Sequence, residues 1–269
     1  MPKKPIITLL TDFGLEDTYV AEMKAVILSI CPNATLVDLT HNIEPYNIRM
    51  GAYLLARSAE QFPEGTVHLA VVDPGVGGPR KPLIIETNSA FFVGPDNGLL
   101  VLAAEKLGIS HVYEITNRAY MRKEVSNVFH GRDIFAPAAA YLALGVPAKE
   151  FGEEIFDYVK PSYTKPKIFR DKIVGEVIHI DHFGNIITNI TKKQLNMKGI
   201  DYGKSFSIIF KNRKPVKVKL LESYSKAKKR ELLTIVGSGG FIEVSANMAN
   251  ASKILNVKPG TKVTFNFSS

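Results

Sequence analysis

The chain has 269 residues, of which 45% are hydrophobic and 22% are charged, and its formal net charge is +8. This length can bury a substantial core, and no hydrophobic run approaches the ~20 apolar residues that a membrane-spanning helix needs. The single cysteine, Cys31, excludes an internal disulfide and a cysteine-rich metal site, and we expect it in the core. The apolar stretch before Asp12 is too brief for a secretion signal, so we expect a cytoplasmic protein without a membrane partner.

Through about residue 150, short apolar runs alternate with segments of helical periodicity. This alternation predicts an α/β domain whose mostly parallel sheet is covered by helices on both faces. Strands are expected at 6–10, 35–39, 67–72, 83–87, 91–93 and 112–115, and helices at 18–31, 48–62, 98–107 and around 138–144.

The second part of the chain has a different texture. Pro161 and Pro166 lie among polar residues and predict an extended linker over 158–170. Seven short strands are then expected, which indicates a smaller all-β, barrel-like domain: 174–180, 186–190, 206–210, 216–220, 232–236, 241–244 and 262–267. The predicted domains are therefore 1–157 and 171–269.

Polar clusters follow the predicted strands of the first domain, at 11–14, 73–80 and 94–97, and a fourth cluster at 129–133 opens a helix. Because ligands bind beyond the carboxyl ends of parallel strands, we expect these loops to gather on one rim. Helix capping is the alternative for four of their residues: Asp12, Asp96, Asn97 and Asp133. His130 is either a hydrogen-bonded polar residue or a proton carrier.

Several kinds of site are excluded by the residue patterns. The six histidines are scattered, and His179 and His182 lack metal-ligand spacing, so no metal is expected. The phosphate-binding and dinucleotide-binding glycine motifs are missing, as are the serine elbow and a plausible cysteine nucleophile. A hydrolase built on this chain would have to activate water directly.

Most of the excess positive charge lies in the last hundred residues. A lysine-rich barrel that tracks an RNA backbone is one interpretation, with tyrosine and phenylalanine for base stacking. The aromatic residues alternate as core positions do, so we expect solvated hairpin surfaces and no nucleic-acid partner. Glutamine occurs only at Gln61 and Gln194, while lysine and glutamate are plentiful, a composition that favours a thermophilic source.

Six segments in order carry a resemblance to a known family: TDFG followed by D-x-Y-V-A-x-M-K, VVDPGVGG, GPDNGLL, FHGRDIFAPAAA, IDHFGNIITNI and GSGGFIEVSANMANA. From residue 6 to about 254 the chain resembles the S-adenosylmethionine hydroxide adenosyltransferases, relatives of the fluorinating and chlorinating enzymes. The resemblance implies that water or hydroxide attacks the 5′ carbon of S-adenosylmethionine, giving adenosine and methionine without a cofactor. It also implies a homotrimer whose sites lie between one subunit's first domain and a neighbour's second.

The resemblance implies a reacting set of Asp73, Arg80 and His130. It further implies substrate contacts: Asp12 with the ribose hydroxyls, Tyr46 as an aromatic contact, Asp181 with the methionine amine, Phe183 stacked on adenine, Asn185 on the purine edge, Ser238 with the methionine carboxylate and the backbone near Met248 with adenine. Halogenases have an arginine after the serine, whereas Gly239 follows here, which points to a rearranged amino-acid pocket that includes Glu243.

The chemistry agrees with this set. Attack by an anion on a sulfonium carbon loses charge in the transition state, so a dry pocket favours it. Arg80 stays protonated and can stabilise hydroxide, while Asp73 or His130 accepts the proton, and the sequence leaves that choice open. The alternatives are a sensor that binds S-adenosylmethionine or adenosine without turnover, and a halogenase. Halide-using relatives have other residues where Asp73 and His130 stand.

Overall fold

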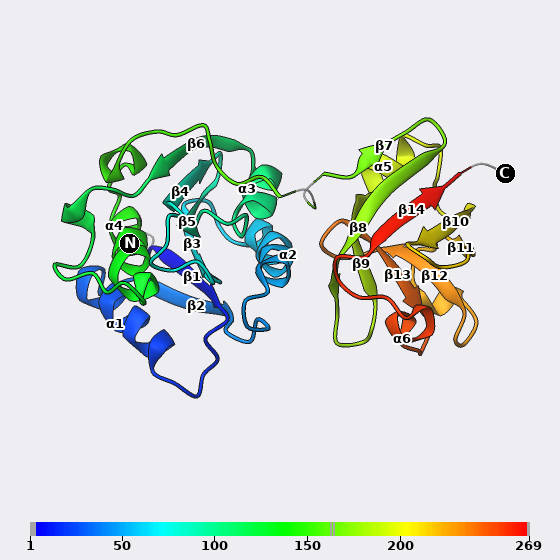
Figure 1. Ribbon diagram of the computed structural model, residues 1–269, viewed down its shortest axis with the longest axis horizontal. Helices are drawn as coiled ribbons and strands as arrows, with labels where there is room; N and C mark the ends of the chain where they lie inside the picture. Colours follow the sequence, from blue (N-terminus) through cyan, green and yellow to red (C-terminus); the bar gives the residue numbers. More distant parts are fainter. Residues whose placement is uncertain (1–3, 162, 164, 268–269) are drawn as a thin grey trace. The chain divides into compact units, whose positions relative to one another are not determined.

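The structure is a computed structural model that describes residues 4–161, 163 and 165–267. The chain forms two compact units, Met1–Lys160 and Pro161–Ser269 (Figure 1). The boundary falls within the range 158–170, in which Ser162 and Thr164 lie outside the described residues, as do 1–3 and 268–269. Among the described helices, none has both the length and the apolar character needed to cross a membrane.

The first unit is built on a six-stranded sheet with the order β2-β1-β3-β5-β4-β6. Its strands are β1 (Ile6–Thr11), β2 (Thr35–Thr40), β3 (Thr66–Val71), β4 (Pro82–Thr87), β5 (Ala90–Pro95) and β6 (Ile109–Glu114). β1 pairs in parallel with β2 and β3, and β3 pairs in parallel with β5. β4 runs antiparallel to both of its neighbours. The two residues between β4 and β5 suffice for a hairpin and are too few for a parallel crossover. The predicted mostly parallel sheet is confirmed, with β4 as its reversed strand.

Four α-helices cover this sheet: α1 (Tyr19–Ile30), α2 (Ile48–Ser58), α3 (Val101–Leu107) and α4 (Ala136–Ala143). α1 packs with α4 on one face, and α2 packs with α3 on the other (Figure 1). The helix expected over 98–107 begins only at Val101, and the one expected over 48–62 ends as an α-helix at Ser58 and continues as the short 3-10 helix η1 (Ala59–Gln61).

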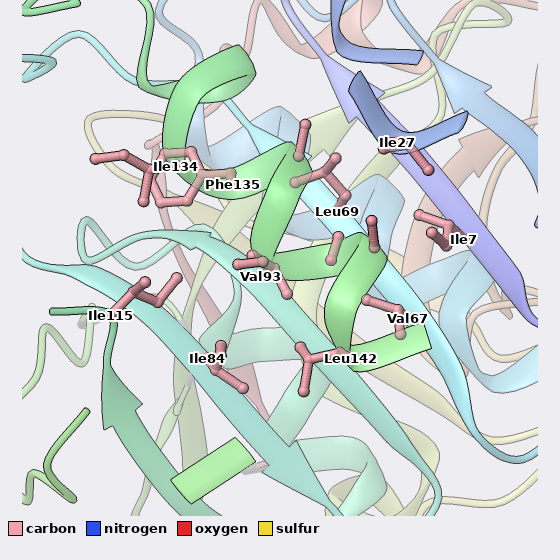
Figure 2. Close-up of a cluster of buried hydrophobic side chains, with 14 of the residues drawn as sticks. Ile7, Ile27, Val67, Leu69, Ile84, Val93, Ile115, Ile134, Phe135 and Leu142 are labelled. Carbon is pink, nitrogen blue, oxygen red and sulfur yellow. The ribbon is translucent and has the colours of Figure 1, made fainter. Parts of the chain in front are cut away.

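The core of the first unit lies between the sheet and the α1–α4 layer. Ile27 from α1 and Leu142 from α4 meet Leu69 and Val93 from the sheet (Figure 2). Phe135 is fully buried in the same cluster and belongs to a π-helical turn, η3 (Gly131–Phe135), that precedes α4. A tightly packed layer therefore anchors the segment that follows His130.

The second unit is an antiparallel sheet with the order β11-β10-β14-β8-β9-β13-β12, to which β7 adds beside β8. Its strands are β7 (Lys167–Ile168), β8 (Lys172–Ile180), β9 (Ile186–Thr191), β10 (Ser205–Phe210), β11 (Val216–Lys219), β12 (Leu232–Val236), β13 (Phe241–Ala246) and β14 (Lys262–Asn266). A bridge between Leu220 and Thr234 joins the two edge strands, which nearly closes the sheet into the predicted barrel.

Two short helices interrupt the strand-only pattern expected beyond the linker, and the strand β7 lies within the range 158–170 that was expected to be linker. α5 (Lys192–Asn196) begins with a capping box of Thr191 and Gln194, and α6 (Ala251–Leu255) is capped by Asn250. Each capping residue satisfies a backbone N–H that the first helical turn leaves unpaired. Helices of five residues are too short to produce a periodic apolar pattern, so only their caps could have revealed them.

Candidate functional site

Three loops leave the same edge of the first sheet. β1, β3 and β5 are parallel neighbours, so their carboxyl ends lie together, and the loops containing Asp12, Asp73 and Asp96 begin there. The turn that carries His130 joins them, since the rings of Phe13 and Phe129 lie 5.9 Å apart. This is the gathering on one rim that the sequence predicts.

Asp73 and Arg80 form a closely bonded ion pair across the loop that follows β3. Arg80 Nε lies 3.1 and 3.0 Å from the two carboxylate oxygens of Asp73, and Arg80 Nη2 donates to Asp73 Oδ2 at 2.6 Å. Both side chains are nearly buried, with 10% of Arg80 and 5% of Asp73 exposed. Two donors on one rigid guanidinium fix its plane relative to the carboxylate.

The same guanidinium holds His130. Arg80 Nη2 lies 2.6 Å from His130 Nδ1. A guanidinium can only donate, so Nδ1 must be the acceptor and the ring proton of the neutral imidazole resides on Nε2. Burial, and after it the positive charge of Arg80, lowers the pKa of His130 below its ordinary value. The guanidinium also lies 5.3 Å from the ring centre of Phe135.

Glycines in the 73–80 loop allow it to approach the segment before His130. Gly77 has φ +75°, which favours glycine, and a Cβ placed there would collide with the backbone oxygen of Asn127. Two local backbone hydrogen bonds also turn the loop: the N–H of Val76 donates to the carbonyl of Asp73, and the N–H of Gly78 donates to the carbonyl of Gly75. The glycine-rich sequence thus brings Asp73 and Arg80 against the chain that carries His130.

Asp133 anchors the turn from within. It is fully buried, and its carboxylate accepts from Arg132 Nε at 2.7 Å, Arg122 Nη1 at 3.2 Å and the backbone N–H of Ser126 at 2.8 Å. These hydrogen bonds, led by Arg132, lower the pKa of Asp133 although burial opposes them. The capping interpretation of Asp133 is wrong, because the residue lies inside η3 and binds side chains of its own turn.

The capping interpretations of the other loop residues are also wrong. Asp12 Oδ2 accepts from the backbone N–H of Tyr46 at 2.8 Å, whereas α1 begins after Thr18. Asp96 accepts from the backbone N–H of Val159, and Asn97 Nδ2 donates to the carbonyl of Val72. These side chains connect loops at the rim. None of them is the N-cap of a helix, although Asn97 Oδ1 accepts from the backbone N–H of Leu99 in the turn before α3. Tyr46 itself is 73% exposed with φ +67°.

In the second unit, Asp181 and Asn185 organise the turn between β8 and β9. Asp181 Oδ1 accepts from the backbone N–H groups of Phe183 and Asn185, and Asn185 Nδ2 donates to Asp181 Oδ2 at 2.8 Å. The turn leaves Phe183 76% exposed. Met248 is 80% exposed on a second turn, which meets the first where Gly184 abuts Asn250. The two adjoining turns therefore expose two large apolar side chains, Phe183 and Met248.

Glu243 and Ser238 lie on the β12–β13 hairpin, Glu243 within β13 and Ser238 in the exposed turn. Glu243 Oε2 accepts from the hydroxyl of Tyr224 at 3.1 Å, and Asn185 Nδ2 lies 3.5 Å from the same phenol oxygen. Tyr224 therefore joins residues that the sequence singled out, although nothing in its own surroundings marked it. The residues next to Tyr224 in the sequence include several lysines, which are typical of an exposed surface.

Within the ranges that the structure describes, no group of three or more His, Cys, Asp and Glu side chains lies together so that it could hold a metal ion. The expectation that the protein works without metal or cofactor stays a prediction. Cys31 is buried, in agreement with its expected core position.

Two family models match the chain. The model of the SAM hydroxide adenosyltransferase N-terminal domain matches residues 7–152, and that of the C-terminal domain matches residues 175–264. The chain belongs to this family.

Relatives of this adenosyltransferase chain include proteins named (R)-S-adenosyl-L-methionine hydrolase. The one from Methanocaldococcus jannaschii is 42% identical, covering 94% of this chain and 92% of that protein, and the one from Thermus thermophilus is 34% identical, covering 96% and 98%. A protein from Nocardia brasiliensis named fluorinase is 27% identical over 97% of this chain and 96% of its own. The crystal structure of an uncharacterised conserved protein from Thermotoga maritima is similar, with TM-score 0.88, 38% identity and coverage of 97% and 99%.

Proposed function

We propose that this protein hydrolyses S-adenosyl-L-methionine to adenosine and L-methionine. Water or hydroxide attacks the ribose 5′ carbon, and the sulfonium sulfur leaves as the thioether of methionine. The observation that carries the proposal is the clamp of Arg80 between Asp73 and His130, nearly buried beside the rim of the first sheet. Relatives named as hydrolases of this compound support the substrate.

The three side chains have complementary tasks in this reaction. The neutral imidazole of His130 presents its Nε2–H as a donor to the oxygen that attacks, and Arg80 supplies the positive charge that stabilises developing hydroxide. Asp73 is the proton acceptor that this tautomer leaves, because His130 Nδ1 is already engaged by Arg80. As the new C–O bond forms, the water oxygen becomes strongly acidic, so a carboxylate suffices to take its proton.

A halogenase is the nearest alternative, in view of the fluorinase relatives. A buried carboxylate beside the nucleophile position repels a halide ion while it accepts a proton from water. Asp73 therefore favours hydrolysis. A sensor without turnover would have no use for a histidine whose pKa is lowered and whose proton is fixed on one nitrogen.

We assign the remaining family positions to substrate binding. Asp12 and Tyr46 belong to the ribose side, Phe183, Asn185 and the backbone near Met248 to adenine, and Asp181, Ser238 and Glu243 to the amino-acid end. The exposed apolar faces of Phe183 and Met248 support an adenine surface in the second unit.

We propose that the active protein is a homotrimer in which a neighbouring subunit completes each site. The reacting set lies in the first unit and the adenine and methionine residues in the second. Charge supports such an association, because residues 161–269 carry 20 lysines and arginines against 7 acidic residues, whereas residues 1–160 carry 14 against 19. A cytoplasmic location, a thermophilic source and the lack of a nucleic-acid partner stay predictions.

The names of the relatives specify the R epimer of the substrate. The sulfonium sulfur is a stereocentre, and an in-line attack requires it to leave opposite the nucleophile. We therefore propose that this chain also prefers the R epimer, and separated epimers offered in parallel would test the preference.

The test is incubation with S-adenosylmethionine in ¹⁸O-labelled water, with chloride or fluoride present. Adenosine labelled in its 5′ hydroxyl, formed with equal amounts of methionine, is the expected product. Unlabelled adenosine would contradict attack by water at the 5′ carbon. A 5′-halogenated nucleoside would identify a halogenase, and bound but unchanged substrate would identify a sensor.

A further inference from the structure

His41 lies where two neighbouring strands end, and it contacts the loops that follow both of them. β1 and β2 are parallel, so the loop after Thr11 and the loop after Thr40 leave the sheet side by side (Figure 1). His41 Nδ1 lies 2.8 Å from Thr11 Oγ1, and the His41 carbonyl accepts from the backbone N–H of Gly14 at 2.9 Å. The side chain of His41 therefore holds the first loop at its start, and its backbone holds the same loop further along.

The His41 ring is buried and has a polar neighbour at each nitrogen. His41 is 3% exposed and Thr11 is fully buried. His41 Nε2 lies 3.0 Å from Asp38 Oδ1 on β2, and Asp38 Oδ2 accepts from Lys24 Nζ on α1 at 2.6 Å. Burial raises the pKa of Asp38, but Lys24 and His41 outweigh burial and lower that pKa, so Asp38 is a carboxylate at neutral pH. A carboxylate beside Nε2 favours the proton on that nitrogen, which leaves Nδ1 to accept from the Thr11 hydroxyl.

Thr11 connects His41 to the loop that contains Asp12. Thr11 Oγ1 accepts from the backbone N–H of Phe13 at 3.2 Å, which fixes the peptide group that follows Asp12. In the loop after β2, the backbone N–H of Tyr46 donates to Asp12 Oδ2 at 2.8 Å. Asp12 is therefore held at its backbone through His41 and at its carboxylate by Tyr46.

The later part of the Asp12 loop is open to solvent and gives Asp12 little support. Residues 15–19 are all exposed, and a Cβ placed on Gly14 would meet no atom within 4 Å. Asp12 itself is half-buried. A carboxylate has about four acceptor sites, of which the N–H of Tyr46 takes one, so Asp12 keeps capacity for two hydroxyl donors.

We propose that His41 is a positioning residue for ribose recognition. Through Thr11, His41 holds the loop in the conformation in which the Asp12 carboxylate faces both ribose hydroxyls. The inference rests on the proposed function, in which Asp12 binds the ribose of S-adenosylmethionine. Because the His41 ring is buried, it acts through Asp12 and not by contact with the substrate.

The experiment measures calorimetric affinities for adenosine and for 2′,3′-dideoxyadenosine, which lacks both ribose hydroxyls. Wild type should bind adenosine more tightly, and the ratio of the two dissociation constants is called here the ribose preference. His41→Ala should reduce the ribose preference about 10-fold, the scale of one hydrogen bond to a charged group, and should leave the affinity for the dideoxy compound unchanged. His41→Asn can accept from Thr11 through its amide oxygen and should recover part of the preference.

His68→Ala is the matched control. His68 is also fully buried, and its Nδ1 also lies 2.8 Å from a threonine hydroxyl on β1, that of Thr8. Thr8 lies within the strand and not at the loop, so His68→Ala should lose stability and keep the wild-type ribose preference. If His41→Ala does not fold, Thr11→Val removes the hydroxyl that His41 contacts and should reduce the preference, with Thr8→Val as its control.

A double variant tests whether His41 acts through Asp12. Asp12→Ala should abolish the ribose preference, and adding His41→Ala should then lower adenosine affinity no further, because the two residues act in one chain of contacts. A further loss in the double variant would overturn the inference, as would a wild-type preference in His41→Ala.

Equal weakening of both nucleosides in His41→Ala would also overturn the inference, since it would indicate a purely structural role. In each of these cases wild type still binds adenosine, so the proposed function stands. If wild type binds neither nucleoside, the proposed function and the inference fail together.

Discussion

Arg80 donates from one guanidinium nitrogen to His130 Nδ1 at 2.6 Å, and the same nitrogen donates to Asp73 Oδ2 at an equal distance. One planar group therefore sets the tautomer of the histidine and the orientation of the carboxylate together. A point charge in its place would satisfy one of these partners and leave the geometry of the other free.

The first prediction concerns that geometry. Arg80→Lys keeps the positive charge but removes the planar fork, so we expect kcat for adenosine formation to fall at least ~100-fold, the scale of a lost charge-stabilising group. Arg118→Lys is the matched control at an exposed position and should keep wild-type rates. Wild-type turnover by Arg80→Lys would show that charge alone suffices.

The second prediction concerns pH. Because burial and Arg80 lower the pKa of His130, its imidazole stays neutral at pH values where an ordinary histidine is half protonated. Protonation of Nδ1 would break the bond from Arg80, so activity should decline only as the pH falls below about 6.5. A profile of kcat/KM against pH measures this decline.

His130→Asn provides the comparison for the pH profile. An asparagine keeps a donor and an acceptor but has no group that titrates in this range, so the rate should drop about 100-fold and the histidine-dependent decline should vanish. An unchanged decline in His130→Asn would show that a group other than His130 causes it.

The choice of Asp73, Arg80 and His130 comes from the family resemblance, whereas their position on one rim is predicted from the loops of a parallel sheet. Asp73 follows β3 directly, and the fold places that strand end beside those of β1 and β5. The glycines around Gly77 permit a close backbone approach, which the structure shows to be with Asn127. Strand ends and glycines can be recognised in the local sequence, and the parallel sheet brings the loops that contain them together at the candidate site.

Tyr224 was missed for the opposite reason. It lies 39 residues from Asn185 and 19 from Glu243, and its neighbours are lysines and serines typical of an exposed turn. Only the closure of the antiparallel sheet brings the 3-10 helix η6 (Tyr224–Lys226) to Asn185, just before β9, and to Glu243 on β13. Asp133 was misinterpreted as a cap because the π-helical turn before α4 has no periodic signal, and burial inside that turn cannot be read from neighbouring residues.

The third prediction treats Asp133 as a positioning residue for His130. Asp133→Asn leaves Arg132 and Arg122 without their buried carboxylate, and breaking a buried ion pair of this kind costs about 3–5 kcal/mol. The charge of Asp133 also raises the pKa of His130, so its removal should move the acid decline of activity to lower pH. Denaturant unfolding and the pH profile measure the two effects.

Asp171→Asn is the control for this variant, since it removes the same charge from an exposed position in the second unit. A merely structural role of Asp133 would reduce stability without moving the acid decline. If the pH profile of Asp133→Asn matches that of wild type, Asp133 does not act on His130.

The fourth prediction concerns His68, which is fully buried on β3 between β1 and β5. Its Nδ1 lies 2.8 Å from Thr8 Oγ1, its ring stacks on Phe92, and its Nε2 has no hydrogen-bond partner among the described residues. Burial lowers the pKa of His68 from 6.5 to about 4. The folded state therefore holds a neutral imidazole where the unfolded chain would take up a proton. The resulting stability is complete above pH 6.5 and is lost as the pH falls toward 4, with a magnitude of about 3 kcal/mol.

In His68→Gln, which cannot titrate, the free energy of unfolding should fall less steeply across this window than in wild type, whereas exposed His182→Gln should follow wild type. Parallel curves for all three proteins would show that His68 does not contribute to the acid sensitivity of the fold.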